Sequence, residues 1–399
     1  MSKMSDVPDV LVIGGGIVGL SIAYGAARHG AHVAVLDESE LDTDPARDTS
    51  SLIWLQGKAA GPAAQARWRR ESARQWSNFD RALCADAGTA PLLHQPGGFF
   101  FCFSDEDLHR RGELMQSLQD SLDGDYPFKM LDHHALKARL PDIGPEVVGA
   151  SFTPMDGQVD PVRLLRALHE CCERRGVTIH QDQHVGSIRQ VQGMFQLRTA
   201  TNVWRARKIV LAAGLDNRRL AAHVGLLMPV FRQRGGRVLI SQPIAPFLPY
   251  PTNTVRQLQD GSICFGDAVE DAGLASASLD SMGEMVLQGL RTFPHLGRVH
   301  LKHSWQAPRV GAPDGSPVWQ ASQRCPGAFV VTGESSVTLA AAHAMRLAPW
   351  IVDWTQSDAL ESTLADAVLD AAPLGLSAAN KQPLLMLDRS DQTAFPVLP

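Results

Sequence analysis

The clearest pattern of hydrophobic and polar positions lies at the start of the chain. Residues 9–13 (DVLVI) predict a short buried strand, and apolar residues at helical spacing follow over 20–29. Residues 31–36 (AHVAVL) predict a second strand. Strand, glycine-rich turn, helix and strand fill about 30 residues, the size of one βαβ unit. A βαβ unit is therefore expected here.

The rest of the chain alternates between α/β-like and antiparallel patterns. The small and polar residues over 38–61 predict a loop, and Asp160 followed by Pro161 predicts the capped start of a helix. Alternating runs at 186–198, 236–241 and 262–266 predict antiparallel strands. Further helices are expected over 62–86, 106–122, 162–175, 281–293 and 337–354, and further strands over 177–181, 208–213 and 328–332.

This order predicts an α/β fold with an α+β insertion, that is, a Rossmann-like nucleotide-binding domain plus an antiparallel-sheet substrate domain. The nucleotide-binding domain is expected to be discontinuous, over 1–90, 145–225 and 300–370. The substrate domain would take 91–144 and 226–299. Residues 371–399, rich in Pro, Leu and Ser, are expected to form a C-terminal tail.

Composition narrows the class of protein. The 399 residues carry 37 Lys and Arg against 42 Asp and Glu, a net charge of −5, which argues against a nucleic-acid binder. The longest apolar run, 10–27, contains five glycines and is too short for a transmembrane helix. It also lacks the features of a signal peptide. We expect a cytoplasmic protein, with peripheral association with the inner membrane as the alternative.

The six cysteines form no C-x-x-C pair, and Cys171 and Cys172 are adjacent within a helical pattern. Neither arrangement suits a zinc cage or an iron–sulfur cluster. We expect reduced core thiols and no metal.

The glycine-rich turn has the spacing G-x-G-x-x-G. Gly14 would permit the tight turn, Gly16 would let a pyrophosphate approach the backbone, and Gly19 would let the helix pack on the sheet. Asp37, at the end of the next strand, is placed to bind ribose hydroxyls and selects against a 2′-phosphate. The expected dinucleotide contacts are Gly14, Gly15, Gly16, Ile17, Val18, Gly19, Asp37 and Glu38.

Together with later segments, this motif resembles the D-amino-acid oxidase superfamily of FAD enzymes. The segments that carry the resemblance are VLVIGGGIVGLSIAYGAARHGAHVAVLD (10–37), DGQVDPVRLLRAL (156–168), KIVLAAG (208–214), HSWQAPRVGAPDGSP (303–317) and GESSVTLAAAHA (333–344). Two more segments, 51–68 and 249–268, are most similar to the FAD-carrying β subunit of bacterial D-hydroxyproline and opine dehydrogenases.

The resemblance implies FAD as the cofactor. Some relatives attach the flavin through a cysteine within the segment corresponding to 305–317, which contains none here, so non-covalent FAD is expected. The further cofactor contacts that it implies are Trp54, Gln56, Val185, Ala213, Gly214, Gly333, Glu334, Ser335, Ser336, Val337 and Thr338.

The resemblance also implies where the substrate binds. Arg309 stands where the family places the arginine that binds the substrate carboxylate, and a guanidinium can fix a carboxylate with two parallel bonds. A surface arginine paired with Asp314 is the alternative. Arg256 is a second candidate clamp, and Thr254 is expected to line the pocket.

The implied reaction is oxidation of the C–N bond of an amino or imino acid, such as hydroxyproline, proline or an opine, by hydride transfer to flavin N5. The chain would be the flavin subunit of a heteromeric dehydrogenase, with partner subunits that carry FAD, FMN or iron–sulfur centres. A stand-alone oxidase like glycine oxidase, which makes hydrogen peroxide, is one alternative. A structural FAD-binding subunit without turnover is another, because Glu334 replaces a histidine that is common in the group. The strand near 262–271 lacks the lysine that sarcosine oxidases place over the flavin, which favours a dehydrogenase.

Overall fold

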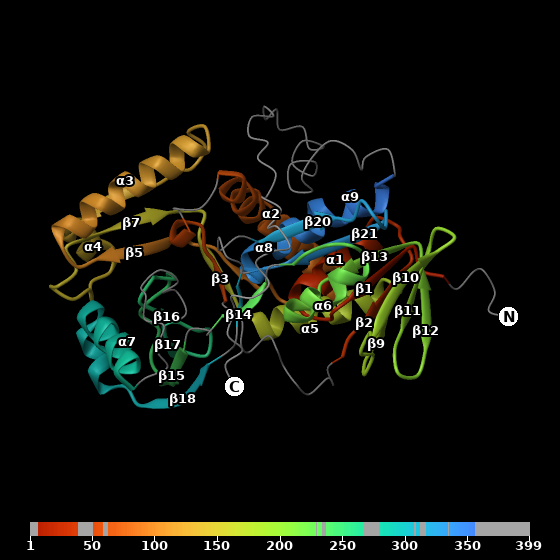
Figure 1. Ribbon diagram of the computed structural model, residues 1–399. Coiled ribbons are helices and arrows are strands. Elements are labelled where there is room, and N and C mark those ends of the chain that lie inside the picture. Colours follow the sequence, from red (N-terminus) through yellow and green to blue (C-terminus); the bar gives the residue numbers. More distant parts are fainter. Residues whose placement is uncertain are drawn as a thin grey trace, which may run out of the picture.

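The computed structural model describes residues 7–38, 51–58, 63–228, 230–233, 237–266, 279–306, 309–311, 317–333 and 335–355. Two parts lie side by side in Figure 1. One contains a six-stranded sheet and the helices that cover it, and the other contains two antiparallel sheets with the helices α3, α4 and α7.

The six-stranded sheet has the order β20-β21-β13-β1-β2-β9 and is parallel except for β20. Alternate residues of its strands face opposite sides, as in any strand. Val10 and Val12 pack with the helices α1, α2, α5 and α8, whereas Leu11 and Ile13 pack with α6 and the sheet β10-β11-β12. The bounds are β1 Val10–Ile13, β2 Val33–Leu36, β9 Thr178–His180, β13 Lys208–Leu211, β20 Val318–Ala321 and β21 Ala328–Thr332.

Helices cover one face of the sheet, and α6 together with the sheet β10-β11-β12 covers the other. Their bounds are α1 Ile17–Arg28, α2 Ala63–Ala87, α5 Pro161–Arg174, α6 Asn217–His223, α8 Ser336–Ala342, α9 Ala348–Asp353, β10 Ser187–Val191, β11 Met194–Arg198 and β12 Val203–Ala206. A π-helix over His343–Leu347 joins α8 to α9. None of the described helices is both long and apolar enough to cross a membrane.

The second part has its own core around Phe99, Phe101, Phe265 and Phe293. Its two sheets have the orders β5-β7-β6 and β16-β17-β15-β18. They meet where Phe99 bridges Thr252 and the Asn253 side chain binds both the backbone N–H and the carbonyl of Phe101. The bounds are β5 Gly98–Cys102, β6 Lys129–Asp132, β7 Gly149–Thr153, β15 Arg237–Pro243, β16 Val255–Gln257, β17 Ser262–Gly266, β18 Leu301–Gln306, α3 Asp105–Ser121, α4 His133–Arg139 and α7 Leu279–Thr292.

Two small sheets complete the described structure. β3 (Leu52–Ile53), β8 (Gly157–Val159) and β4 (Leu93–His94) form the order β3-β8-β4, and β14 (Phe231–Gln233) pairs with β19 (Arg309–Gly311). In Figure 1, β3 lies between the six-stranded sheet and the strands β5 and β7. Short 3-10 helices cover Gln56–Lys58, Gly214–Asp216 and Pro294–Arg298.

The predicted fold class is confirmed, and so are the βαβ unit and the start of α5. The Asp160 carboxylate accepts the N–H groups of Val162 and Arg163 and so caps the helix. The helix predicted over 337–354 is present as α8, the π-helix and α9 in direct succession. At this π-helix Gly25 of α1 packs so closely that a Cβ there would lie 2.1 Å from the carbonyl oxygen of Ala344.

The prediction of a plain loop over 38–61 is wrong for β3, whose two residues pair with the distant β8. The expected domain boundaries stay a prediction. Within the sheets, β7 pairs with β5 and β6, and β18 pairs with β15, although 145–225 and 300–370 were expected in the nucleotide-binding domain. The expected tail, 371–399, lies outside the described residues.

Candidate functional site

The glycine turn after β1 is crowded by neighbouring atoms at Gly14 and Gly19 and open at Gly16. A Cβ added to Gly14 would lie 2.4 Å from the carbonyl oxygen of Ala212, and a Cβ added to Gly19 would lie 1.9 Å from that of Gly14. By contrast, no described atom lies within 4 Å of a Cβ added to Gly16. Gly16 is the N-cap of α1, where free N–H groups and the helix dipole favour a phosphate.

Asp37 lies directly against this turn. A Cβ on Gly15 would meet the Oδ2 atom of Asp37 at 2.1 Å, so only glycine leaves room for the carboxylate. The N–H of Gly14 donates to the carbonyl of Leu36 at 2.8 Å, which ties the turn to the end of β2. The predicted pairing of Gly14–Gly19 with Asp37 therefore has the geometry of a dinucleotide site.

The turn after β13, which holds the predicted cofactor contacts Ala213 and Gly214, lies beside the glycine turn. The N–H of Ala212 donates to the carbonyl of Ile13 at 2.8 Å. Buried Asn217, which was not predicted, accepts from the N–H of Ala213 and donates to the carbonyl of Val331, so it joins the ends of β13 and β21. An Asn three residues after an A-A-G turn is the only sequence signal for this role.

The turn between β21 and α8 is tight. Gly333 has a φ of +131°, and a Cβ there would lie 2.6 Å from the Cα of Pro317. Ser335 has a φ of +66°, which is uncommon for a residue other than glycine and is often found at functional sites. Glu334 lies outside the described residues. Ser336 begins α8, and Val337 is buried in the core.

Thr338, in the first turn of α8, joins this helix to the segment 52–56. Its hydroxyl accepts from the N–H of Trp54 at 3.2 Å and donates to the carbonyl of Leu52 at 3.0 Å. The Trp54 indole is buried and packs with Leu52 and Phe100. The structure thus brings Trp54 to the start of α8, as the cofactor prediction requires.

Gln56 has another role than the predicted flavin contact. Its amide nitrogen donates to the carbonyl of Gly98 and to the carboxylate of Asp156, and its amide oxygen accepts from Ser151 and Arg111. All these side chains are buried, and the four bonds use the whole hydrogen-bonding capacity of the amide. The side chain of Gln56 therefore belongs to a buried polar network.

Asp156 and Arg111, neither of them predicted, are the charged members of that network. The Asp156 carboxylate also accepts the N–H of Leu55 at 2.8 Å, and Arg111 donates to the carbonyl of Gln56 at 2.8 Å. Burial raises the pKa of Asp156 to about 7, although the hydrogen bonds from Leu55 and Gln56 and the charge of Arg111 act in the opposite direction.

The candidate substrate residues lie in the second part and at its junction with the first. Arg256, on β16, is 5% exposed, and its guanidinium donates to the Sγ atom of Cys264 at 3.3 Å. Thr254 is buried beside Thr252, with 3.3 Å between their hydroxyl oxygens. The backbone of Arg309 pairs with Gln233, and its neighbour Val310 lies beside Gly214. The side chain of Arg309 lies outside what the structure describes.

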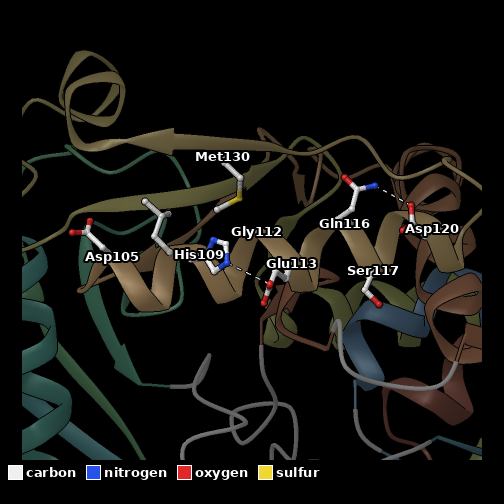
Figure 2. Close-up of a pocket in the computed structure, with 9 residues that line it drawn as sticks. Asp105, His109, Gly112, Glu113, Gln116, Ser117, Asp120 and Met130 are labelled. Carbon is white, nitrogen blue, oxygen red and sulfur yellow. Dashed lines mark hydrogen bonds and ion pairs between the residues drawn. The ribbon is translucent and has the colours of Figure 1, made fainter.

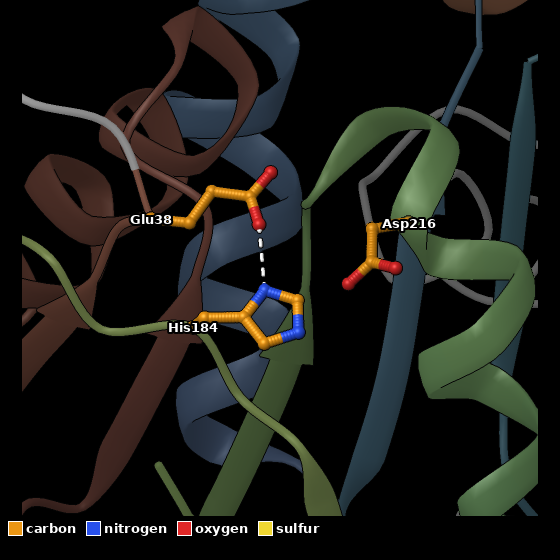
Figure 3. A group of neighbouring side chains, drawn as sticks. All are labelled: Glu38, His184 and Asp216. Carbon is orange, nitrogen blue, oxygen red and sulfur yellow. Dashed lines mark hydrogen bonds and ion pairs between the residues drawn. The ribbon is translucent and has the colours of Figure 1, made fainter. Parts of the chain in front are cut away.

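Glu38, His184 and Asp216 form a cluster near the end of β2 (Figure 3), and Val185 follows His184 in the chain. The Oε2 atom of Glu38 lies 2.9 Å from the Nδ1 atom of His184, and Asp216 completes a group of possible metal ligands. Arg219 already binds Asp216 at 2.6 Å and also donates to the carbonyl of Val185 at 2.7 Å. These contacts form ion pairs within the protein, and the cluster supports no metal proposal.

A separate groove runs along the exposed face of α3 (Figure 2). Two of its carboxylates have partners: Oε1 of Glu113 lies 3.4 Å from Nε2 of His109, and Asp120 accepts from Gln116 at 2.9 Å. None of the predicted site residues lines this groove. The candidate site is therefore the edge of the six-stranded sheet where Gly14–Gly19, Asp37, Ala213 and Gly333 meet.

Comparison with known proteins agrees with this geometry. The family model described as FAD dependent oxidoreductase matches residues 9–350. The chain belongs to this family. FAD is accordingly its cofactor. The residues present fit FAD, because the open side of the turn at Gly16 and the Asp37 carboxylate beside it offer a phosphate site and a ribose partner.

Two relatives, each named as one subunit of an opine oxidase, are similar over almost their whole length. The chain is 39% identical to the relative from Agrobacterium tumefaciens (strain Ach5) and 35% identical to the relative from Rhizobium meliloti. Each alignment covers 88% of this chain and 95% of the relative. Glycine oxidase from Geobacillus kaustophilus has the same fold, with a TM-score of 0.77 at 19% identity over 88% of this chain and 96% of that one.

Proposed function

We propose that this chain is the flavin subunit of a heteromeric enzyme that oxidises the C–N bond of an opine-like amino or imino acid. The observation that carries the proposal is the open turn at Gly16 with Asp37 beside it, in a chain 39% identical to one subunit of an opine oxidase. The relatives' names support an opine as substrate and more than one subunit.

The chain's own residues would bind the substrate and orient it. The Arg309 guanidinium would hold a substrate carboxylate, with Arg256 as a second cation and Thr254 in the pocket wall. Two bonds fix the position and the plane of the carboxylate, so fewer directions remain open to the C–H next to nitrogen. When bound, FAD supplies the acceptor for the hydride from this carbon.

The remaining steps need little from the protein. The substrate nitrogen must lose a proton before the oxidation, and burial of an ammonium favours that loss. Oxidation removes two electrons and leaves a C=N bond, which water hydrolyses to an amine and a carbonyl compound. Because the sequence has no C-x-x-C pair, onward electron transfer would need another chain, a quinone or oxygen.

The test is an anaerobic titration of the purified FAD-loaded chain with opines, proline, hydroxyproline and simple amino acids of both hands. Bleaching of the flavin absorbance by one of these is the expected result. Arg309→Ala should abolish bleaching while FAD stays bound, and Arg298→Ala, which alters an exposed arginine nearby in the sequence, should leave bleaching intact.

Two other outcomes would replace the proposal. Rapid formation of hydrogen peroxide by the isolated chain in air would indicate a stand-alone oxidase. Bound FAD that no substrate bleaches, even with the partner subunits present, would indicate a structural flavin subunit.

A further inference from the structure

The segment 54–56 is held from two directions. Toward the six-stranded sheet, the N–H of Trp54 donates to the hydroxyl of Thr338 in the first turn of α8. Toward the second part, the N–H of Leu55 donates to Oδ1 of Asp156, and the carbonyl of Gln56 accepts from Arg111. A shift of the segment on one side must therefore change its contacts on the other.

Gln56 and Ser151 connect Arg111 to Asp156. The Ser151 hydroxyl accepts from Nε of Arg111 at 2.9 Å and donates to Oε1 of Gln56 at 2.7 Å. Nε2 of Gln56 then donates to Oδ2 of Asp156 at 2.8 Å. Arg111 also lies over the ring of Phe100, with 3.8 Å between its Cζ atom and the ring centroid. Because these groups are buried, each lost bond leaves a polar atom without water.

We propose that Asp156 is a positioning residue of the cofactor site: its carboxylate, linked to Arg111 through Gln56, sets the position of segment 54–56 against the first turn of α8. The inference rests on the proposed flavin site, because Trp54 and Thr338 belong to it. Neither Asp156 nor Arg111 touches the reacting atoms in this proposal.

The hydrogen bonds favour the ionised carboxylate. Both oxygens of Asp156 face donors, namely the N–H of Leu55 and the amide nitrogen of Gln56. A proton on the lone pair that accepts from Leu55 or Gln56 would break that bond. Rotation of the Gln56 amide would not repair the loss, because it would turn a donor toward Arg111 and Ser151.

The protonation state of Asp156 changes near neutral pH. Burial raises its pKa to about 7, and the Arg111 cation acts to lower it. Tyr126 is the other titratable group that faces it, and burial keeps the pKa of that phenol well above its usual value. The other groups that bond to the carboxylate, namely the N–H of Leu55 and the amide and backbone of Gln56, are uncharged. Segment 54–56 should therefore hold the cofactor site in its described form above pH 7 and loosen below it.

The test measures the visible absorption band of the bound flavin and the FAD Kd between pH 5.5 and pH 8.5, without substrate. For the wild-type holoprotein we expect a step in both with a midpoint near pH 7, and a Kd about fivefold weaker at pH 6 than at pH 8, the lower end of usual coupling between linked sites. Asp156→Asn should remove the step. Asp160→Asn alters the exposed cap of α5 and should keep it.

A second variant separates positioning from a merely structural role. Arg111→Gln removes the cation that lowers the pKa of Asp156, so the midpoint should move to higher pH. A wild-type profile without a step between pH 6 and pH 8, a step that survives in Asp156→Asn, or an unmoved midpoint in Arg111→Gln would each overturn the proposal. The readout needs no turnover. A chain that shows the step but is bleached by no substrate would refute the proposed function alone, and one that is bleached without a step would refute this inference alone.

Discussion

The two parts of the molecule contribute to the site in different ways, one through its backbone and the other through buried side chains. In the six-stranded sheet the site is made of backbone: glycines without a Cβ, strand ends and a helix start. In the second part the segment beside it is held by buried side chains, with Arg111, Ser151 and Asp156 around Gln56. A backbone site tolerates most changes except added volume, whereas a buried polar network fails when one partner is removed. The two parts should therefore respond to different substitutions.

Added volume in the glycine turn should have the largest effect on stability. Gly19→Ala would place a Cβ 1.9 Å from the carbonyl oxygen of Gly14, so we expect a loss of about 3 kcal/mol or more in the free energy of unfolding. Gly16→Ala is the matched control, because no described atom lies within 4 Å of its Cβ. It should unfold within about 1 kcal/mol of the wild type and yet bind FAD much more weakly. Urea unfolding and FAD titration measure both, and normal FAD affinity in Gly16→Ala would contradict the phosphate site.

Loss of one residue of the buried network around Gln56 should have the next largest effect on the free energy of unfolding. Arg111→Met removes the donor to Gln56 and Ser151 and leaves Asp156 buried without its cation, for an expected cost of about 3 kcal/mol. The neighbouring Arg110→Ala removes only an exposed pair with Asp107 and should cost less than about 0.5 kcal/mol. Equal costs for the two variants, measured by urea unfolding, would show that the network contributes no special stability.

The two parts should also respond to pH in opposite directions. Burial lowers the pKa of His343, beside Trp319, to about 3, so the unfolded chain binds a proton at this site that the folded protein does not bind between about pH 6.5 and pH 3. Stability from His343 is thus lost as the pH falls through that range. Asp156, with its pKa raised to about 7, binds a proton in the folded protein at a higher pH than in the unfolded chain. Its contribution to the free energy of unfolding therefore rises as the pH falls from about 7 to 4.

Single variants should separate these two pH dependences of the free energy of unfolding. In Asp156→Asn the His343 contribution is no longer opposed by that of Asp156, and the free energy of unfolding should fall by about 2 kcal/mol between pH 6.5 and pH 5. In His343→Gln, whose amide can still accept from Trp319, stability should rise by a similar amount over the same range. Thermal or urea unfolding at the two pH values measures this, and parallel slopes in both variants would refute the assignment.

The link between the two parts should give the smallest change. Thr338→Val keeps the shape of the side chain but removes the partner of the Trp54 N–H and of the Leu52 carbonyl, at an expected cost of about 1 kcal/mol. Thr338→Ser keeps the hydroxyl and should stay closer to the wild type. If Thr338→Val unfolds like the wild type, this link carries no measurable stability.

The amino-acid sequence was sufficient for the features that depend on near neighbours. The run DVLVI, the spacing of Gly14, Gly16 and Gly19, and the pair Asp160–Pro161 act through local rules of strands, turns and helix caps, and each lies where it was predicted. Asp37 was predictable as well, because β2 follows α1 directly and a parallel neighbour must end at the same edge.

The buried network could not be predicted, because its contacts join residues that are far apart in the chain. Gln56 meets Arg111 across 55 positions, Ser151 across 95 and Asp156 across 100. None of these residues shows its partner through periodicity or spacing, so Gln56 was predicted as a cofactor contact within a loop. Burial of a polar group is decided by what the whole fold places around it. For the same reason, the local pattern could not predict the contacts of Asn217 and His343.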